Sequence, residues 1–185
     1  FRSRIIDPFP DALGRAMAAI TKELDRRVRS RHMDRKARER TLSALTLSTD
    51  FDGLRGADLI IEAVPEVPDI KRDALQQCAA RLAPNAILTS NTSSLSLTTL
   101  QEHVDDAGRF AGLHFFNPAP KMPLVEIVLS GGTDSSTTGR LIRFCREIGK
   151  TAVVSKDSPA FVVNRPLAPY LVAAAALAMA GDESA

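Results

Sequence analysis

The sequence of 185 residues has no tryptophan, two cysteines and a net charge of only +2. Two cysteines do not predict a disulfide scaffold, and we expect Cys78 and Cys145 to be small buried thiols in helices. The three histidines lie far apart and form no metal-ligand spacing, so no metal site is expected. A nearly neutral chain also predicts no nucleic acid partner.

The sequence also lacks an apolar run long enough for a membrane span, which takes about 20 residues. Its longest apolar segment, residues 167–180, is rich in alanine and is interrupted by Pro169 and Tyr170. We expect a buried or dimer-forming helix there, and no membrane partner. No signal peptide is visible, and 44% hydrophobic with 25% charged residues is typical of a globular protein, which we expect in the cytoplasm.

Short apolar runs alternate with helical patterns along most of the chain. The expected strands cover residues 4–7, 58–64, 86–90, 109–114, 125–129 and 151–155, and the expected helices begin near residue 11 and cover residues 68–82 and 133–148. Continuously apolar strands joined by helices are typical of a mostly parallel sheet covered on both faces. The pattern therefore predicts a doubly wound α/β fold.

Residues 22–40 form a basic segment, with nine Lys or Arg residues against four acids. We expect a helical hairpin that turns near residues 30–34 and packs through Leu24, Val28 and Met33. Its charge indicates either a solvated helical face or a surface for a polyanionic ligand. Nucleic acid is disfavoured because the segment has no aromatic residue on which a base could stack.

The pattern changes at Pro159, where a short loop leads into a wholly helical segment. We therefore expect a domain boundary there. An α/β domain would cover residues 1–157, and residues 158–185 would begin an all-helical domain.

Residues 87–128 combine the groups that a proton-transfer site needs. A hydroxyl-rich turn, residues 90–94, follows an apolar strand, while His114 ends a second strand and Glu126 lies inside a third. General acid–base catalysis requires a base that titrates near neutral pH, a group that orients it, and donors for the substrate oxygen. A carboxylate inside an apolar strand has to be paired or neutral, and His114 is its natural partner. Taken alone, His114 also fits a hydrogen-bonded core histidine, and Asn117 before Pro118 fits a turn residue.

Four motifs carry a resemblance to a known family. They are SNTSS at residues 90–94, HFFNP at 114–118, LVEI at 124–127 and FVVNR at 161–165. In this order and spacing they resemble the L-3-hydroxyacyl-CoA dehydrogenase family, both its 3-hydroxybutyryl-CoA forms and the dehydrogenase part of multifunctional fatty-oxidation proteins. The resemblance runs over nearly the whole chain. It implies a Rossmann-like fold and interconversion of L-3-hydroxyacyl-CoA and 3-oxoacyl-CoA, in fatty-acid beta-oxidation or butanoate metabolism.

The resemblance also implies four catalytic residues. His114 would accept the hydroxyl proton as hydride leaves for nicotinamide, and Glu126 would orient the imidazole, as an acid does beside histidine in hydrolytic triads. Ser93 and Asn164 would hydrogen-bond the substrate oxygen and the reacting groups.

The cofactor implied by the resemblance is NAD. Its expected contacts are Asp7, Ala63, Glu66, Lys71, Asn91 and Asn117. Asp7 ends the first expected strand, and an acid in that position favours NAD over NADP. The basic hairpin resembles the arm that contacts coenzyme A in this family, which implies an acyl-CoA substrate. For the full-length protein, a homodimer through the helical domain is implied.

The sequence departs from the family in three places. The family's first strand is absent, and none of the ten glycines forms the G-x-G-x-x-G loop that brings backbone N–H groups to a pyrophosphate. Pro166 stands where the family usually carries an aliphatic residue. We therefore expect an internal piece of a longer enzyme, without normal activity on its own.

Two alternatives stay open. A sugar-acid dehydrogenase of the gulonate type would share the scaffold, and competition by free CoA would separate it from an acyl-CoA enzyme. A catalytically silent relative, either a lens-crystallin-like structural protein or a truncated product, would keep the fold without turnover. The missing phosphate loop favours this silent alternative, whereas the intact catalytic set argues against it.

Overall fold

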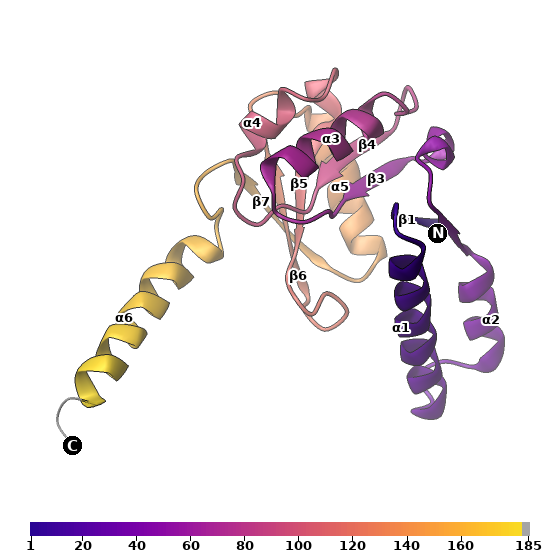
Figure 1. The fold of residues 1–185 in the computed structure, drawn as a ribbon, viewed down its shortest axis with the longest axis horizontal. Coiled ribbons are helices and arrows are strands. Elements are labelled where there is room, and N and C mark those ends of the chain that lie inside the picture. Colours follow the sequence, from indigo (N-terminus) through magenta and orange to yellow (C-terminus); the bar gives the residue numbers. More distant parts are fainter. Residues whose placement is uncertain (183–185) are drawn as a thin grey trace. The chain divides into compact units, whose positions relative to one another are not determined.

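The computed structural model describes residues 1–182. The chain divides into two compact units, Phe1–Gly56 and Ala57–Ala185. In the first unit, β1 covers Ser3–Ile6, α1 Pro10–Arg29, α2 Arg35–Ser43, β2 Leu45–Ser48 and a 3-10 helix Asp52–Gly56 (Figure 1). β1 and β2 pair in parallel. The sequence pattern missed β2, because its four residues, LTLS, are too few to show a strand period.

The basic hairpin is confirmed in this unit. α1 begins at Pro10, where a missing N–H is tolerated, and Asp34 caps α2 by accepting a hydrogen bond of 2.6 Å from the amide of Ala37. Arg38 of α2 pairs with Asp25 of α1 at 2.6 Å, and Leu24 is buried. The turn between the helices therefore falls where the sequence predicted it.

The second unit holds a five-stranded sheet in the order β3-β4-β5-β6-β7. The strands are β3 Leu59–Glu62, β4 Ile87–Ser90, β5 Phe110–Phe115, β6 Leu124–Leu129 and β7 Thr151–Lys156, and the helices are α3 Pro68–Ala79, α4 Leu97–Gln101, α5 Ser135–Glu147, α6 Asn164–Asp182 and a 3-10 turn at Ala107–Arg109. All neighbouring strands run parallel except β5 and β6. The mostly parallel α/β fold is confirmed, and the expected strands differ from these by one or two residues at their ends.

Helices cover both faces of this sheet. Leu113 of β5 and Ile127 of β6 are fully buried in one cluster with Leu141 of α5. On the other face, a Cβ added to Gly112 would lie 2.9 Å from the side chain of Leu97 in α4. α4 therefore packs closely only because residue 112 has no side chain. In Figure 1, α3 and α4 lie in front of the sheet and the fainter α5 lies behind it.

The antiparallel pair β5–β6 decides the geometry of the site. Its register places Gly112 opposite Val128 and His114 opposite Glu126. Directly opposed residues have Cβ atoms about 4.5–5.5 Å apart. Because side chains alternate along a strand, His114 and Glu126 lie on the α4 face rather than the α5 face.

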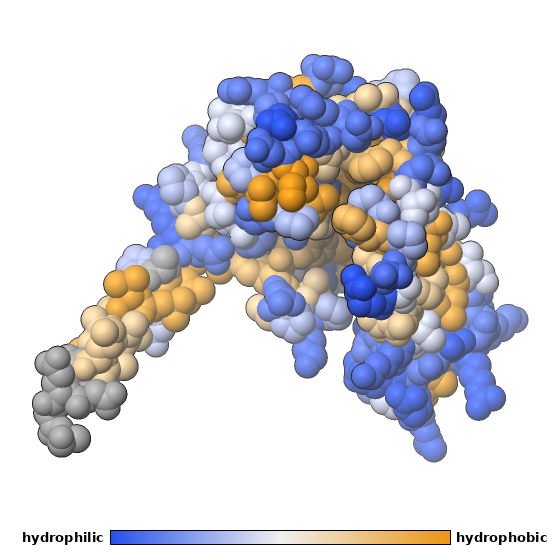
Figure 2. Space-filling view, in the orientation of Figure 1, coloured by the Kyte–Doolittle hydropathy of each residue, from blue (hydrophilic) through white to orange (hydrophobic). Residues whose placement is uncertain are grey.

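The side chains of α6 are mostly exposed. Leu171, Val172, Leu177 and Met179 are between 55% and 75% exposed, and Figure 2 shows this helix as a largely hydrophobic surface. Within the second unit the helix is therefore not buried, and its role in a dimer stays a prediction. Within residues 1–182, no helix combines the length and the hydropathy that crossing a membrane requires.

Both cysteines are free and buried, as the sequence predicted. Burial, followed by the charge of Glu62, raises the pKa of Cys78 to about 12. Burial also raises the pKa of Cys145. Both thiols are therefore protonated at neutral pH and pack as small apolar groups.

Replacing Leu141 with alanine should lower the free energy of unfolding by about 2–5 kcal/mol, because a fully buried side chain leaves a cavity. Urea denaturation measures the change. Arg143→Ala on the same helix is the control, since its side chain is 80% exposed and pairs with Glu147, four residues further along the helix. It should change stability by about 0.5 kcal/mol or less, and equal effects of the two substitutions would contradict this packing.

Candidate active site

His114 and Glu126 form a buried hydrogen-bonded pair across β5 and β6. The Nδ1 atom of His114 lies 2.8 Å from Oε2 of Glu126, and the two residues are 6% and 0% exposed. A carboxylate can only accept, so Nδ1 donates and carries the ring proton of the neutral imidazole. The other nitrogen, Nε2, is then the one that can accept a proton.

Two further donors reach the same carboxylate. Oε1 of Glu126 accepts hydrogen bonds from the backbone amides of Val162 and Val163, at 3.0 and 2.9 Å. A buried charge without partners would cost several kcal/mol, and here both oxygens are satisfied. Glu126 therefore joins the imidazole to the segment that leads directly into Asn164 at the start of α6.

Aromatic rings enclose the imidazole of His114. The ring of Phe116 lies 4.6 Å from it between centroids, and the ring of Phe161 lies 5.8 Å away in an edge-on arrangement. Phe161 is 2% exposed. These contacts restrict rotation of the imidazole and exclude water from its sides.

A left-handed backbone places Phe161 against His114. Ala160 and Phe161 have φ angles of +63° and +53°, a region that costs an L-residue roughly 1–2 kcal/mol. The turn directs the Phe161 ring to the imidazole and the next two amides to Glu126. The structure therefore holds two strained residues to complete the pair.

The hydroxyl-rich turn after β4, residues 90–94, is called the serine turn below, and a second acid, Glu66, holds it. Its Oε1 accepts hydrogen bonds from the hydroxyl of Thr92, from the amides of Ser93 and Ser94 at 2.9 and 3.0 Å, and from the Ser94 hydroxyl at 3.1 Å. Ser93 itself is exposed. Partial burial raises the pKa of Glu66. This effect is outweighed by hydrogen bonds from the Thr92 hydroxyl and the Ser93 and Ser94 amides and by the charge of Lys71, so the pKa falls from 4.5 to about 2.

Lys71 is buried beside two acids and a backbone carbonyl. Its side chain is 1% exposed. The Nζ atom donates to Glu62 at 2.9 Å and to the carbonyl of Val64 at 3.2 Å, and it pairs with Glu66 at 3.2 Å. The structure thus brings Lys71 and Glu66 together beneath the serine turn, and a direct contact of Lys71 with NAD stays a prediction.

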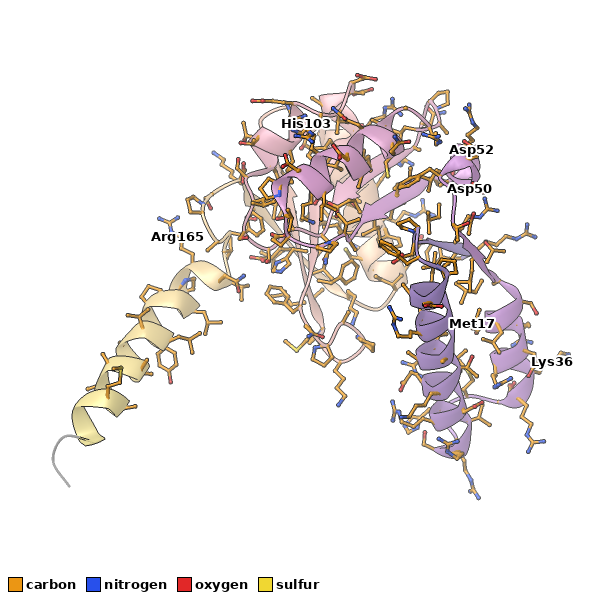
Figure 3. The ribbon with its side chains drawn as sticks, in the orientation of Figure 1. Met17, Lys36, Asp50, Asp52, His103 and Arg165 are labelled. Atoms are coloured by element: carbon orange, nitrogen blue, oxygen red, sulfur yellow. The ribbon has the colours of Figure 1, made fainter. Side chains whose placement is uncertain are left out.

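The other predicted residues lie at the ends of strands and helices. Asn91 follows β4, and its side-chain oxygen accepts a 2.8 Å hydrogen bond from the amide of Phe115, beside His114. Ala63 follows β3 and is exposed, as is Asn117 in the β5–β6 connection. Asn164 is half-buried and begins α6, one residue before Arg165, which Figure 3 labels.

Asp7 follows β1 in the first unit, and its Oδ1 accepts a 2.9 Å hydrogen bond from the amide of Phe9. In the second unit, Ala63 and Asn91 follow the neighbouring parallel strands β3 and β4 and so lie at the same edge of the sheet. Dinucleotides bind at the carboxyl ends of parallel strands in doubly wound folds. Within the second unit, the Glu66 carboxylate, the Asn91 amide and the hydroxyls of the turn after β4 are groups that can hydrogen-bond a ribose or a carboxamide. Their contacts with NAD stay predictions.

Sequence reasoning missed several residues of the site. Phe116 and Phe161 flank the ring, and Glu62 anchors Lys71. A signal for Glu62 was present, because a carboxylate at the end of the apolar run LIIE needs a partner, as Glu126 does. The two amides that bind Glu126 give no signal in a sequence.

A doubly wound sheet whose polar residues gather at the carboxyl ends of its parallel strands is typical of dinucleotide-binding domains. The family model described as "3-hydroxyacyl-CoA dehydrogenase, NAD binding domain" matches residues 1–158. The chain belongs to the 3-hydroxyacyl-CoA dehydrogenase family, and the matched part is the NAD-binding domain of that family.

Individual relatives agree with this assignment. The chain is 38% identical to a probable 3-hydroxyacyl-CoA dehydrogenase of Caenorhabditis elegans and 37% identical to the mitochondrial hydroxyacyl-coenzyme A dehydrogenase of Mus musculus, over 97% of its length in each case. It spans about 60% of the length of these two relatives. The crystal structure of FadB2 from M. tuberculosis matches 97% of this chain and 64% of that protein, with a TM-score of 0.93 and 34% identity.

Replacing Ala160 with glycine should raise the free energy of unfolding by about 1 kcal/mol, because glycine adopts the left-handed region without steric cost. Urea denaturation measures the change. Ala80→Gly is the matched control, since Ala80 is exposed and has a φ of −61°. There the substitution should lower stability by up to about 1 kcal/mol, and a loss of stability at residue 160 as well would contradict the strain.

The contribution of Glu66 to stability should depend on pH. Because the pKa of Glu66 is lowered to about 2 in the folded chain, its stabilising effect is full above about pH 4.5 and is lost as the pH falls towards 2. Urea denaturation of the chain and of Glu66→Gln should therefore differ most above pH 4.5 and converge at lower pH. The exposed Glu102→Gln controls for the lost charge, and a difference for Glu66→Gln that is independent of pH would contradict the anchoring.

Proposed function

We propose that the protein carrying this chain is an NAD-dependent oxidoreductase that interconverts L-3-hydroxyacyl-CoA and 3-oxoacyl-CoA, in fatty-acid beta-oxidation or butanoate metabolism. The observation that carries the proposal is the buried pair of His114 and Glu126, with one imidazole nitrogen donating to the acid. The family to which the chain belongs supports the same activity.

His114 is the general acid–base in this proposal. In the oxidation direction, Nε2 accepts the proton of the substrate hydroxyl, and in the reduction direction it returns a proton to the ketone oxygen. NAD, when bound, supplies the nicotinamide ring that exchanges hydride with the substrate carbon. Glu126 holds Nδ1 protonated and stabilises the imidazolium that forms, while Ser93 and Asn164 hydrogen-bond the substrate oxygen and the reacting groups.

The cofactor contacts proposed are those at the strand ends. Asp7 would hold the ribose of NAD, and Ala63, Glu66, Asn91 and Asn117 would line the nicotinamide side, with Lys71 behind them. The exposure of Ala63 and Asn117 and the place of Asn91 beside Phe115 support this assignment.

The substrate proposed is an acyl-CoA, held in part by the basic hairpin. Between α1 and α2 a shallow pocket is lined by Asp25, Val28, Arg29, Arg35, Arg38 and Glu39. Arg38 pairs with Asp25 and with Glu39, each at 2.6 Å, whereas Arg29 and Arg35 suit the phosphates of coenzyme A, because the guanidinium fork matches phosphate geometry. The names of the worm and mouse relatives also favour a CoA thioester over a sugar acid.

We also propose that the α/β domain ends near residue 157 and that the expected helical domain, residues 158–185, begins there and dimerises; residues 183–185 of that range lie outside the described part of the chain. The family model matches to residue 158, and the apolar side chains of α6 are exposed, which supports both points. The cytoplasmic location stays a prediction, and the mouse relative is named mitochondrial.

Replacing His114 with asparagine should lower kcat for acetoacetyl-CoA reduction by about 10²–10⁴, because the proton donor is lost. The assay follows NADH absorbance in the longer enzyme that we expect to carry these residues. His103→Asn is the control and should leave kcat unchanged, because His103, labelled in Figure 3, follows the C-cap of α4 and is not among the residues proposed to contact substrate or cofactor. Equal activity of His114→Asn and the unmodified enzyme, or no turnover of any 3-oxoacyl-CoA by the unmodified enzyme, would refute the proposal.

A further inference from the structure

A chain of buried polar side chains runs beneath the serine turn and starts at Glu62. Glu62 ends β3, where it is the register partner of Ser90 in β4. Its Oε2 accepts a 2.5 Å hydrogen bond from the Ser90 hydroxyl, and its Oε1 accepts one of 2.7 Å from the amide of Val64. The side chain is 1% exposed, so these donors and a cation have to balance its charge.

Lys71 supplies that cation from α3. Its ammonium has three N–H donors. It donates to both oxygens of Glu62, at 2.9 and 3.2 Å, and to the Val64 carbonyl at 3.2 Å, and it forms an ion pair with Oε2 of Glu66 at 3.2 Å. Each donor therefore has an acceptor within the protein, and the ammonium is held at a fixed point between two acids.

Glu66 connects Lys71 to the serine turn. Its Oε2 faces Lys71, and its Oε1 accepts from the backbone amides of Ser93 and Ser94. A carboxylate pinned on one side by a buried ammonium has one orientation available, and its hydrogen bonds fix the backbone that carries the Ser93 side chain. Three charged side chains from β3, α3 and the β3–α3 loop thus hold the backbone of the turn that carries the Ser93 hydroxyl.

We propose that Glu62 and Lys71 are positioning residues, which hold Glu66 and through it set Ser93 for the reaction proposed above. The inference rests on that function for the role of Ser93, but the mechanical linkage does not. Neither residue touches the substrate in this arrangement. Loss of the pair would loosen the turn while leaving the His114–Glu126 pair intact, since that pair is built on β5 and β6.

The test is hydrogen exchange by NMR in the double variant Glu62→Gln/Lys71→Met. Both replacements are uncharged and close in size, so no buried charge is left unpaired. The amides of Ser93 and Ser94 should exchange at least about tenfold faster, which corresponds to a weakened hydrogen bond to a charged group. The amides of Val162 and Val163, bound to Glu126, should stay within about twofold and serve as the internal control.

Controls separate positioning from general stability. Lys156→Met removes an exposed lysine of β7 and should change none of the four amides. Glu62→Asp, which keeps the charge of the buried pair but shortens the acid, is the milder variant for the case that the double variant does not fold, and it should move the same two amides in the same direction. Unchanged exchange at Ser93 and Ser94, or an equal increase at all four amides, would overturn the proposal.

A kinetic measurement connects the linkage to the reaction. In the full-length protein, Glu62→Asp, which leaves the expected NAD contact Lys71 in place, should lower kcat by about tenfold, the effect expected of a misplaced catalytic group, with a smaller change in KM. Exchange is measured without cofactor or substrate, so its outcome is independent of whether the enzyme acts on 3-oxoacyl-CoA. Loosened amides with an unchanged kcat would remove the positioning role.

Discussion

The carboxylate of Glu126 is the constraint on which the proposed site depends. It is fully buried in β6, where a charge is tolerated only if donors surround it. The donors come from two separate segments: one imidazole nitrogen on β5 and two backbone amides that precede α6. One anion therefore fixes both the orientation of His114 and the path of the chain towards Asn164.

A second acid organises the other half of the site in the same manner. Glu66 holds the serine turn with one oxygen and meets Lys71 with the other. In both cases a carboxylate accepts hydrogen bonds from backbone amides of a segment far away in sequence. These bonds restrict the motion of that segment. Catalytic groups on loops need this support, because displacing a catalytic hydroxyl by about 1 Å greatly reduces its contribution to the reaction rate.

The sequence predicted the buried pair and most strands, because buried positions carry characteristic residue types. Glu126 between two apolar neighbours had to have a partner, and the apolar runs placed β3 to β7 within one or two residues. The antiparallel direction of β6 left no such record, since it depends on where the connection after Phe116 returns. The left-handed turn at Ala160 was equally hidden, because alanine does not signal a positive φ as glycine would. The contact of Lys71 with NAD stays a prediction, and its burial between two acids appears only once α3 is packed on β3.

The tautomer of the His114 ring tests the central claim most directly. Nitrogen-15 NMR of the imidazole, at a pH where the ring is neutral, distinguishes the nitrogen that carries hydrogen from the one that does not. A hydrogen on Nδ1 and a bare Nε2 is the predicted result, since the Glu126 carboxylate can only accept. A neutral ring with its hydrogen on Nε2 would contradict the account, because no acid would then be steering the base.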